Sequence, residues 1–394
     1  DVDGATTAAF VFKTIADPFA GKINLFRVVK GEVTTESALL DLREHAKERM
    51  GSLVQLQGKE TKPAKEFDEG DIGAVAKLKD VRTGDLLVDR ELELTVEPLA
   101  FPDPVMSFAV TPRIKGEEEK VASAIRRLAE EDPTLRLRRD PQTGEEILSG
   151  MSQMHVEVAL ERAKRRFGVD VELHPPRVPY LETIRKEARA RHRYKKQTGG
   201  RGQFGDCEIV LEPIDGHQGY EFVDKIVGGV IPNKYIPAVD RGIQESAERG
   251  VVAGYPMVDF QVECFDGSYH DVDSNEMSFK MAGILAFRTV APKARPVLLE
   301  PLADLEVWTP EDVLGDVMGD LSARRGQILG TEADGRLTKV RAVVPESELY
   351  RYSTTLYSIT HGRGTYRHGF HGYVEAPPDV AARVAEEHKE EQGH

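Results

Sequence analysis

The fold of this chain is decided by residues 105–131, which read VMSFAVTPRIKGEEEKVASAIRRLAEE. Residues 105–111 predict a strand. The stretch from Glu117 to Glu131 follows, and its apolar residues recur at helical spacing at Val121, Ala124, Ile125 and Leu128. This spacing predicts an amphipathic helix that Pro133 ends. A strand followed by such a helix indicates the start of an α+β unit.

The residues that come next complete this unit. Residues 135–139 and 146–149 are expected to pair as strands across a turn at 140–144. A second helix carries apolar residues at helical spacing at Val156, Leu160, Ala163 and Phe167, and residues 169–173 close the set as a strand. The order βαββαβ predicts a ferredoxin-like domain.

The same order returns in residues 297–376, with little sequence likeness to the first unit. We expect a strand at 297–307, a helix at 310–324 and a hairpin over 328–344. A short helix at 346–355 and a strand at 365–374 follow, and a charged helix begins at Asp379. The sequence therefore predicts a second ferredoxin-like domain.

The remaining segments predict two further domains. Residues 1–100 hold many short strand-like runs separated by glycines, which is typical of a small β-barrel, and the polar segment 58–70 is predicted as a loop. Residues 180–296 hold two strands and two helices whose order the sequence leaves open. Proline clusters separate the segments. The predicted domains are 1–100, 101–178, 179–296 and 297–394.

Composition limits the kinds of protein that this chain can be. Its 394 residues include 53 Lys and Arg against 67 Asp and Glu, so a nucleic-acid site must be a local basic patch. Two cysteines exclude a disulfide scaffold and fit a reducing, cytoplasmic compartment. No apolar run approaches about 18 residues, so we expect no membrane span. The chain starts at Asp1 without a signal peptide, and we expect a piece of a longer protein or a processed form.

Motifs for catalysis and cofactor binding find little support. Residues 200–205 match GxGxxG, but a basic stretch precedes them and a strand follows, so a flexible loop is favoured over a dinucleotide site. No P-loop motif occurs. His155 and Glu157 lack the cysteines of a zinc deaminase, and His155 is expected to be structural or at an interface. We predict no catalytic, cofactor-binding or metal-binding residue in this chain.

A basic segment is more informative. Residues 185–201 contain eight Lys or Arg and one acid, a net charge of +7 within a chain of −14. Together with Tyr194, Phe204 and flexible glycines, this charge suits an RNA backbone, whereas the alternative is a solvated strand or helix face. His270 lies in a turn-rich segment at a predicted loop tip, where function concentrates, although an exposed histidine without a role is an equal alternative.

Six longer motifs resemble bacterial elongation factor G. They are FKTIADPFAGK (12–22), SGMSQMHVE (149–157), QTGGRGQFG (197–205), VGGVIPNKYIPAV (227–239), DGSYHDVDS (266–274) and GDLSARRGQILG (319–330). The resemblance covers the second to fifth domains of the family and lacks its GTP-binding domain. It implies a translation-factor OB-like β-barrel, two ferredoxin-like domains, and between them a ribosomal-protein-like α+β domain with tip loops that reach the decoding centre.

The resemblance also implies a function. Elongation factor G is a ribosome-dependent GTPase that moves tRNA and mRNA, so the expected partners are the ribosome, with its RNA and proteins, tRNA and mRNA. We expect a monomer. GTP and Mg²⁺ would bind the family's GTP-binding domain, and no nucleotide-hydrolysing site is expected in these 394 residues.

Residue roles follow by match to the family motifs. The tip contact with tRNA and mRNA is assigned to His270, Ser268, Gly200, Arg201, Gly202 and Gln203, and the basic RNA contact to Lys195, Lys196, Arg193 and Lys234. Arg324 and Arg325 should face large-subunit RNA. His155 and Pro104 should face the GTP-binding domain, where the family's fusidic-acid pocket forms.

Two segments depart from the family pattern. Residues 367–373 read RHGFHGY where the family usually has MEFDHY, and residues 55–63 also differ. These departures suggest a divergent second copy of the factor. The alternatives are a ribosome-protection or recycling factor of the same superfamily and a stand-alone, non-catalytic RNA-binding module.

Overall fold

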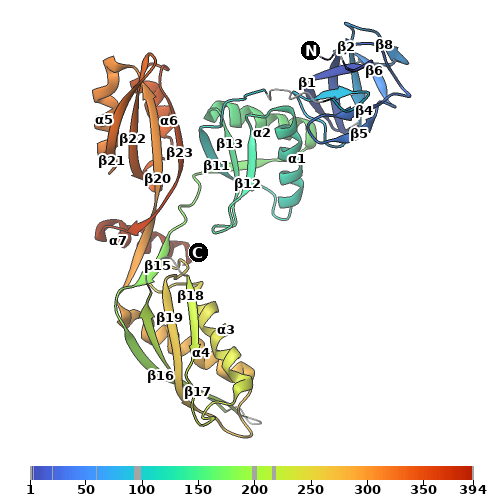
Figure 1. The fold of residues 1–394 in the computed structure, drawn as a ribbon. Coiled ribbons are helices and arrows are strands. Elements are labelled where there is room, and N and C mark those ends of the chain that lie inside the picture. Colours follow the sequence, from blue (N-terminus) through green and yellow to red (C-terminus); the bar gives the residue numbers. More distant parts are fainter. Residues whose placement is uncertain are drawn as a thin grey trace. The chain divides into compact units, whose positions relative to one another are not determined.

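The computed structural model describes residues 2, 4–19, 21–58, 60–92, 99–197, 202–214 and 219–392 (Figure 1). The chain divides into two compact units. Unit 1 comprises residues 1–177 with 350–358, and unit 2 comprises residues 178–349 with 359–394. In the part of the chain that is described, no helix is long and apolar enough to cross a membrane.

The N-terminal segment folds into an eight-stranded antiparallel sheet with the order β5-β4-β10-β1-β2-β9-β6-β7. Residues from strands near both ends of this path, such as Leu39 and Leu53, share one core with Phe26, so the sheet curls into a barrel. The strands are β1 (Ala8–Asp17), β2 (Gly21–Lys30), β4 (Ala38–Asp41), β5 (Ala46–Arg49), β6 (Leu53–Gln57), β7 (Glu60–Pro63), β9 (Ile72–Ala76) and β10 (Leu86–Val88), and a separate pair joins β3 (Val33–Thr34) to β8 (Glu66–Phe67).

The prediction of a loop over residues 58–70 is wrong, because β7 and β8 lie within it. All four side chains of β7 are exposed, and β7 pairs with β6 at the end of the sheet. A strand with no buried face has no apolar alternation for a sequence pattern to detect.

The first ferredoxin-like domain confirms the predicted order. It consists of β11 (Met106–Pro112), α1 (Glu118–Glu131), β12 (Arg136–Arg139), β13 (Glu146–Gly150), α2 (Gln153–Phe167) and β14 (Val171–His174). Its sheet has the order β12-β13-β11-β14. The predicted helix face is buried, and Val121, Ile125 and Leu128 pack with Phe108 and Val156 in one core.

The α+β domain settles the order that the sequence left open. Its elements are β16 (Ala188–Lys196), β17 (Gln203–Pro213), β18 (Tyr220–Asp224), α3 (Ile236–Ala247), β19 (Phe260–Ser268) and α4 (Glu276–Val290), with short 3-10 helices η1 (Asn233–Tyr235) and η2 (Ala291–Ala294). The sheet order is β16-β17-β19-β18, and β18 runs parallel to β19. Both helices contribute to a core that contains Phe260, Phe279 and Phe287.

The last sheet has four strands of the expected unit and one unexpected strand. Its expected strands are β20 (Pro296–Thr309), β21 (Gln327–Asp334), β22 (Leu337–Pro345) and β23 (Thr365–Glu375), and the unexpected one is β15 (Leu181–Ile184), which pairs with β20. The helices are α5 (Leu314–Ala323), α6 (Tyr352–Ile359) and α7 (Pro378–Gln392), with η3 (Glu311–Val313) and η4 (Glu346–Glu348). The predicted helix at 346–355 is therefore shifted, because a 3-10 turn precedes α6.

A fully buried carboxylate organises the root of the α+β domain. Glu182 of β15 accepts hydrogen bonds from four backbone N–H groups, which belong to Val251 (2.6 Å), Val252 (2.8 Å), Ala253 (2.8 Å) and Tyr255 (3.2 Å). Helix α7 covers this region through a shared core that includes Val380, Val384, Tyr180, Ala253 and Leu298. No local sequence pattern marks Glu182, because its hydrogen-bond partners lie about 70 residues away along the chain.

Candidate nucleic-acid interface

Two loops meet at the end of the α+β domain where β16 stops and β17 begins. Gly202 donates its N–H to Asp273 Oδ1 (3.1 Å), and Phe204 donates its N–H to the Asp273 carbonyl (2.9 Å). Ser274 Oγ donates to the Phe204 carbonyl (2.9 Å). These bonds join the loop that precedes β17 to the loop that follows β19 and form one tip. Gly200 and Arg201 lie outside the described residues.

His270 is the exposed side chain that this framework holds in one orientation. Its backbone N–H donates to Ser274 Oγ (2.9 Å), and its side chain is 57% exposed. The ring Nδ1 accepts from the N–H groups of Val272 and Asp273 (3.3 Å each). A ring nitrogen that accepts carries no proton, so the neutral ring bears its proton on Nε2. His270 thus offers an Nε2–H donor on an exposed ring.

The other predicted tip residues bond within the domain. Gly202 is buried, and its backbone N–H donates to Asp273. Gln203 Oε1 accepts from the Tyr194 hydroxyl (2.9 Å). Ser268 Oγ donates to Asp206 Oδ2 (2.6 Å). Of the described residues assigned to the tip contact, His270 is exposed, Gly202 joins the two tip loops, and Gln203 and Ser268 are half-buried and bond to other residues of the domain.

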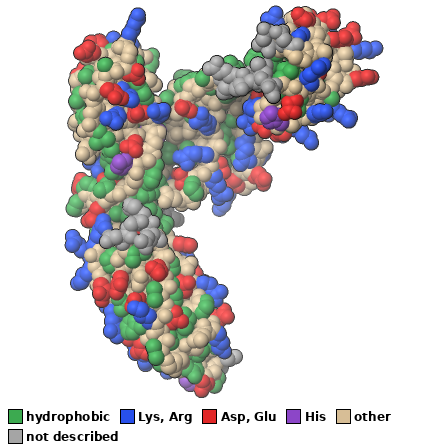
Figure 2. Space-filling view, viewed as in Figure 1, with side chains coloured by type: hydrophobic (Ala, Val, Ile, Leu, Met, Phe, Trp, Pro, Cys, Tyr) green, Lys and Arg blue, Asp and Glu red, His purple; other side chains and the backbone are tan. Residues whose placement is uncertain are grey.

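Most of the positive charge on β16 is neutralised by acids from neighbouring strands. Arg189 pairs with Glu208 (2.7 Å), Arg191 with Asp206 (2.7 Å), and Arg193 lies 3.6 Å from Asp206. Figure 2 shows acidic and basic side chains interspersed over the domain. The net charge of +7 counted along residues 185–201 therefore overstates the field at this surface.

The three lysines that were predicted to contact RNA differ from these arginines. Lys195 and Lys196 are exposed at the end of β16, and neither forms an ion pair with a described residue. Lys234 is exposed, and its Nζ lies 4.9 Å from the centre of the Tyr235 ring. The hydroxyl of Tyr235 donates to the Ser274 carbonyl (3.1 Å), which ties η1 to the tip. Cations free of acidic partners are the ones that can bind a phosphate backbone.

Asp206 is the buried acid that anchors the basic strand. Burial alone would raise its pKa, but hydrogen bonds from Arg191 and Ser268 outweigh burial and hold the pKa below the ordinary value. We expect Asp206→Asn to destabilise the domain by about 2–3 kcal/mol, because the two hydrogen bonds from Arg191 lose their buried carboxylate, while Arg191 keeps the more exposed Asp266 as its partner.

The pH dependence of this loss has a definite sign. A depressed pKa gives stabilisation that is complete above the unfolded-state pKa of about 4 and is lost as the pH falls through the folded-state pKa. The difference in unfolding free energy between the wild type and Asp206→Asn, measured by urea unfolding, should therefore be smaller at pH 3 than at pH 6. An equal difference at both pH values would contradict this assignment.

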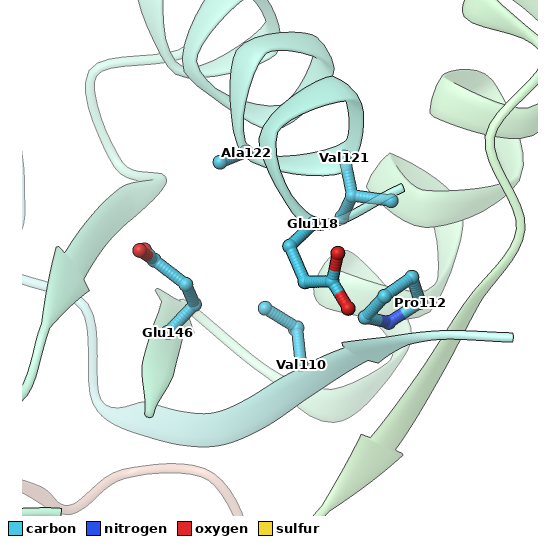
Figure 3. A pocket seen from close by; sticks show the side chains of 6 residues that line it. All are labelled: Val110, Pro112, Glu118, Val121, Ala122 and Glu146. Atoms are coloured by element: carbon cyan, nitrogen blue, oxygen red, sulfur yellow. The ribbon is translucent and has the colours of Figure 1, made fainter. Parts of the chain in front are cut away.

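Outside the tip, a cavity of about 1370 Å³ is lined by residues of the barrel and of the first ferredoxin-like domain, among them Lys22, Arg82 and Leu137. Among the described residues, no group of three or more His, Cys, Asp or Glu side chains could hold a metal ion. A small pocket beside α1, lined by Val110, Glu118 and Glu146 among others, measures about 40 Å³, which is room for about one water molecule. Figure 3 shows the two carboxylates on either side of Val110, turned away from each other.

Comparison with protein families accounts for nearly the whole chain. Residues 6–90 match elongation factor G domain 2, and residues 101–175 match elongation factor G domain III. Residues 176–295 match elongation factor G domain IV, and residues 297–384 match the elongation factor G C-terminus. The chain belongs to the elongation factor G family.

A solved structure supports the same assignment. A crystal structure of a protein from Thermus thermophilus is 40% identical to this chain and superposes with a TM-score of 0.79. The match covers 98% of this chain and 58% of that one, so this elongation-factor-G-family chain spans a little over half the length of that relative. The tip described above belongs to the region that matches domain IV.

The two arginines expected to face large-subunit RNA are engaged within the family's C-terminal domain. Arg324 donates to Asp320 (2.9 Å) and to the Glu348 carbonyl (2.5 Å), and its side chain is 18% exposed. Arg325 donates two hydrogen bonds to Glu300 (2.8 and 3.0 Å), which is buried. Their guanidinium groups therefore hold the segment after α5 in place.

His155 also has a structural environment. Its Nδ1 accepts from the Met151 N–H (3.1 Å), and its Nε2 lies 2.9 Å from Asp132 Oδ2. This pair joins the start of α2 to the end of α1. Burial would raise the pKa of Asp132, but hydrogen bonds from Thr134 and His155 lower it. Pro104 is half-buried in the segment before β11.

Proposed function

We propose that this chain is the ribosome-binding portion of a translational GTPase of the elongation factor G family, and that it promotes tRNA–mRNA translocation. The observation that carries the proposal is the exposed His270 ring, which is fixed by two backbone amides at the tip of the domain-IV fold. Exposed Lys195 and Lys196 end the strand that leads into this tip. We further propose that the protein acts as a cytoplasmic monomer.

The proposed role of the tip is mechanical. A donor on a rigid support, next to cations without acidic partners, can occupy a site beside tRNA and mRNA and block their return. GTP hydrolysis is not assigned to this chain, since the sequence contains no P-loop to hold a nucleotide. GTP and Mg²⁺ belong to the GTP-binding domain of the family.

The lysines at the tip should contribute a salt-dependent part of ribosome binding. Each phosphate contact adds about 0.7–0.9 to the slope of log K against log salt concentration, so Lys195→Ala with Lys196→Ala should lower the slope by about 1.5. The measurement is sedimentation of the chain with 70S ribosomes from 50 to 200 mM salt.

The matched control is Arg189→Ala on the same strand. Its guanidinium already pairs with Glu208, so removing it should leave the slope nearly unchanged. An equal loss of slope in both variants, or binding of the wild type that does not depend on salt, would refute the electrostatic role of the two lysines.

His270→Ala should slow translocation by about tenfold when the chain is joined to a GTP-binding domain of the family. The reason is the loss of one hydrogen bond to a charged group, worth about 1.5 kcal/mol, and about 1.4 kcal/mol is one decade in rate. GTP hydrolysis should stay nearly unchanged. The measurement is single-round translocation followed by a fluorescent mRNA, with phosphate release recorded in parallel.

A second variant separates the donor from the bulk of the ring. His270→Gln keeps an N–H donor at similar reach and should recover most of the lost rate. Equal loss of translocation and GTP hydrolysis in His270→Ala would refute the assignment. Ribosome binding and hydrolysis without translocation by the wild type would instead favour a recycling or protection factor.

A further inference from the structure

A second group of exposed cations lies where the α+β domain joins β20. Lys186 precedes β16, and Lys293 and Arg295 follow α4. Backbone hydrogen bonds bring the two segments together, because the N–H groups of Arg185 and Lys186 donate to the Ala294 carbonyl at 3.1 and 3.0 Å. All three side chains are exposed. The chain therefore places three cations around one backbone junction.

These cations differ from those in the middle of β16. Among the described residues, Lys186, Lys293 and Arg295 form no ion pair, and the neighbouring acid Glu187 pairs with none of them. Arg189 and Arg191, by contrast, have carboxylate partners within 3 Å. At the junction itself Arg185 pairs with Glu375 (3.0 Å), so Lys186, Lys293 and Arg295 are the junction cations without an ion pair among the described residues.

Arg295 also has an unusual backbone conformation. Its φ is +52°, in the left-handed region that glycine and asparagine adopt more readily than arginine. Backbone outliers of this kind cost about 1–3 kcal/mol and occur where the surrounding structure enforces them, often at functional sites. Here the conformation coincides with the free cations.

The group lies far from the tip. Strand β16 has nine residues between Lys186 and the tip, which at about 3.3 Å per residue corresponds to roughly 30 Å. Helix α4 has 15 residues between the tip loop and Lys293, which gives about 21 Å. One RNA phosphate cannot reach both groups, so this is a separate surface.

We propose that Lys186, Lys293 and Arg295 form a second RNA-binding site of this domain. This site binds a phosphate backbone where the domain joins β20, while the tip makes a separate contact. This proposal rests on the proposed function, since it takes ribosomal RNA as the ligand. Large exposed apolar side chains are absent from residues 181–187 and 291–297, all of which are described, whereas protein interfaces have apolar or aromatic anchors at their centre. A phosphate backbone is therefore favoured over an acidic protein.

The first test compares two charge-matched triple variants of the full chain. The first triple variant carries Lys186→Gln, Lys293→Gln and Arg295→Gln. Its binding to purified small ribosomal subunits should show a slope of log K against log salt concentration that is lower by about two. The remaining slope should include the contribution of the tip lysines. The control is Lys47→Gln, Arg49→Gln and Lys62→Gln, which removes three exposed barrel cations. A control with the same loss of slope would overturn the proposal. A wild type that does not bind at all would count against the proposed function itself.

The second test locates the ligand directly. Both native cysteines are fully buried, and burial raises the pKa of Cys264 to about 12, so an introduced cysteine can be labelled selectively. An iron chelate on Lys293→Cys should cleave ribosomal RNA at positions distinct from those cleaved from Tyr269→Cys at the tip. Cleavage of RNA from the tip alone would overturn the root site. Cleavage of a ribosomal protein in place of RNA from residue 293 would show a protein partner and also overturn it.

Discussion

Glu182→Ala is expected to destabilise unit 2 by about 4 kcal/mol or more, because one buried and three part-buried N–H groups lose their acceptor and each unsatisfied buried group costs about 1–3 kcal/mol. The side chain of Glu182 is fully buried, and Gly250 and Tyr255 pack closely around it. Water cannot replace the carboxylate without reopening this loop, so the loss should be large.

The chain supplies its own probe for this experiment. Trp308 is the sole tryptophan and lies on β20, the strand that pairs with β15. Its fluorescence during urea unfolding should report a lower midpoint for Glu182→Ala. Glu182→Gln keeps one carbonyl acceptor, so its unfolding midpoint should fall less than that of Glu182→Ala. Glu187→Ala changes an exposed position and should have the midpoint of the wild type. An unchanged midpoint in Glu182→Ala would contradict the role given to the carboxylate.

The second large effect concerns the contact between α3 and α4. A Cβ atom on Gly242 would lie 2.2 Å from the Lys280 carbonyl oxygen, and one on Gly283 would lie 2.5 Å from that of Val239. Both obstacles are helix backbone, which cannot rotate aside as a side chain can. We expect Gly242→Ala or Gly283→Ala to cost about 3 kcal/mol or more, because the helices must separate.

A matched control separates overpacking from helix propensity. Gly319 lies in α5 with open space around its Cβ position, so Gly319→Ala should stabilise by about 0.5–1 kcal/mol. Thermal unfolding followed by circular dichroism measures both the expected destabilisation of the α3–α4 variants and the expected stabilisation of Gly319→Ala. If Gly242→Ala and Gly283→Ala both unfold at the wild-type temperature, the contact between α3 and α4 can adjust, which would contradict our expectation.

Much of the fold follows from patterns local in the sequence. The helix face of Val121, Ile125 and Leu128 and the βαββαβ order could be predicted, because each element carries its own apolar period. Strand β15 could not, since its four residues pair with a strand more than 100 positions away. Strand β7 could not be predicted either, because all of its side chains are exposed and its sequence shows no alternation of apolar and polar residues.

The candidate site was predictable to a similar extent. His270 stands out as an aromatic base in a turn-rich loop, and the structure exposes it. Its support depends on distant residues, as Gly202 bonds to Asp273, 71 positions away. The charge count along β16 overstates its positive field for the same reason, because Asp206 and Glu208 of the next strand pair with Arg191 and Arg189. Arg324 and Arg325 match a family motif, which does not reveal their bonds to Asp320 and Glu300.

The pairing of β15 with β20 has a mechanical consequence. Residues 181–184 lead into the α+β domain, residues 296–299 lead out of it, and the two segments are hydrogen-bonded side by side. A single peptide linker would act as a swivel with several free torsions, whereas two bonded strands resist twisting and bending as a short beam does. The α+β domain should therefore move as a rigid lever, and a force on its tip should be transmitted to the sheet around β20 with little bending of the connection.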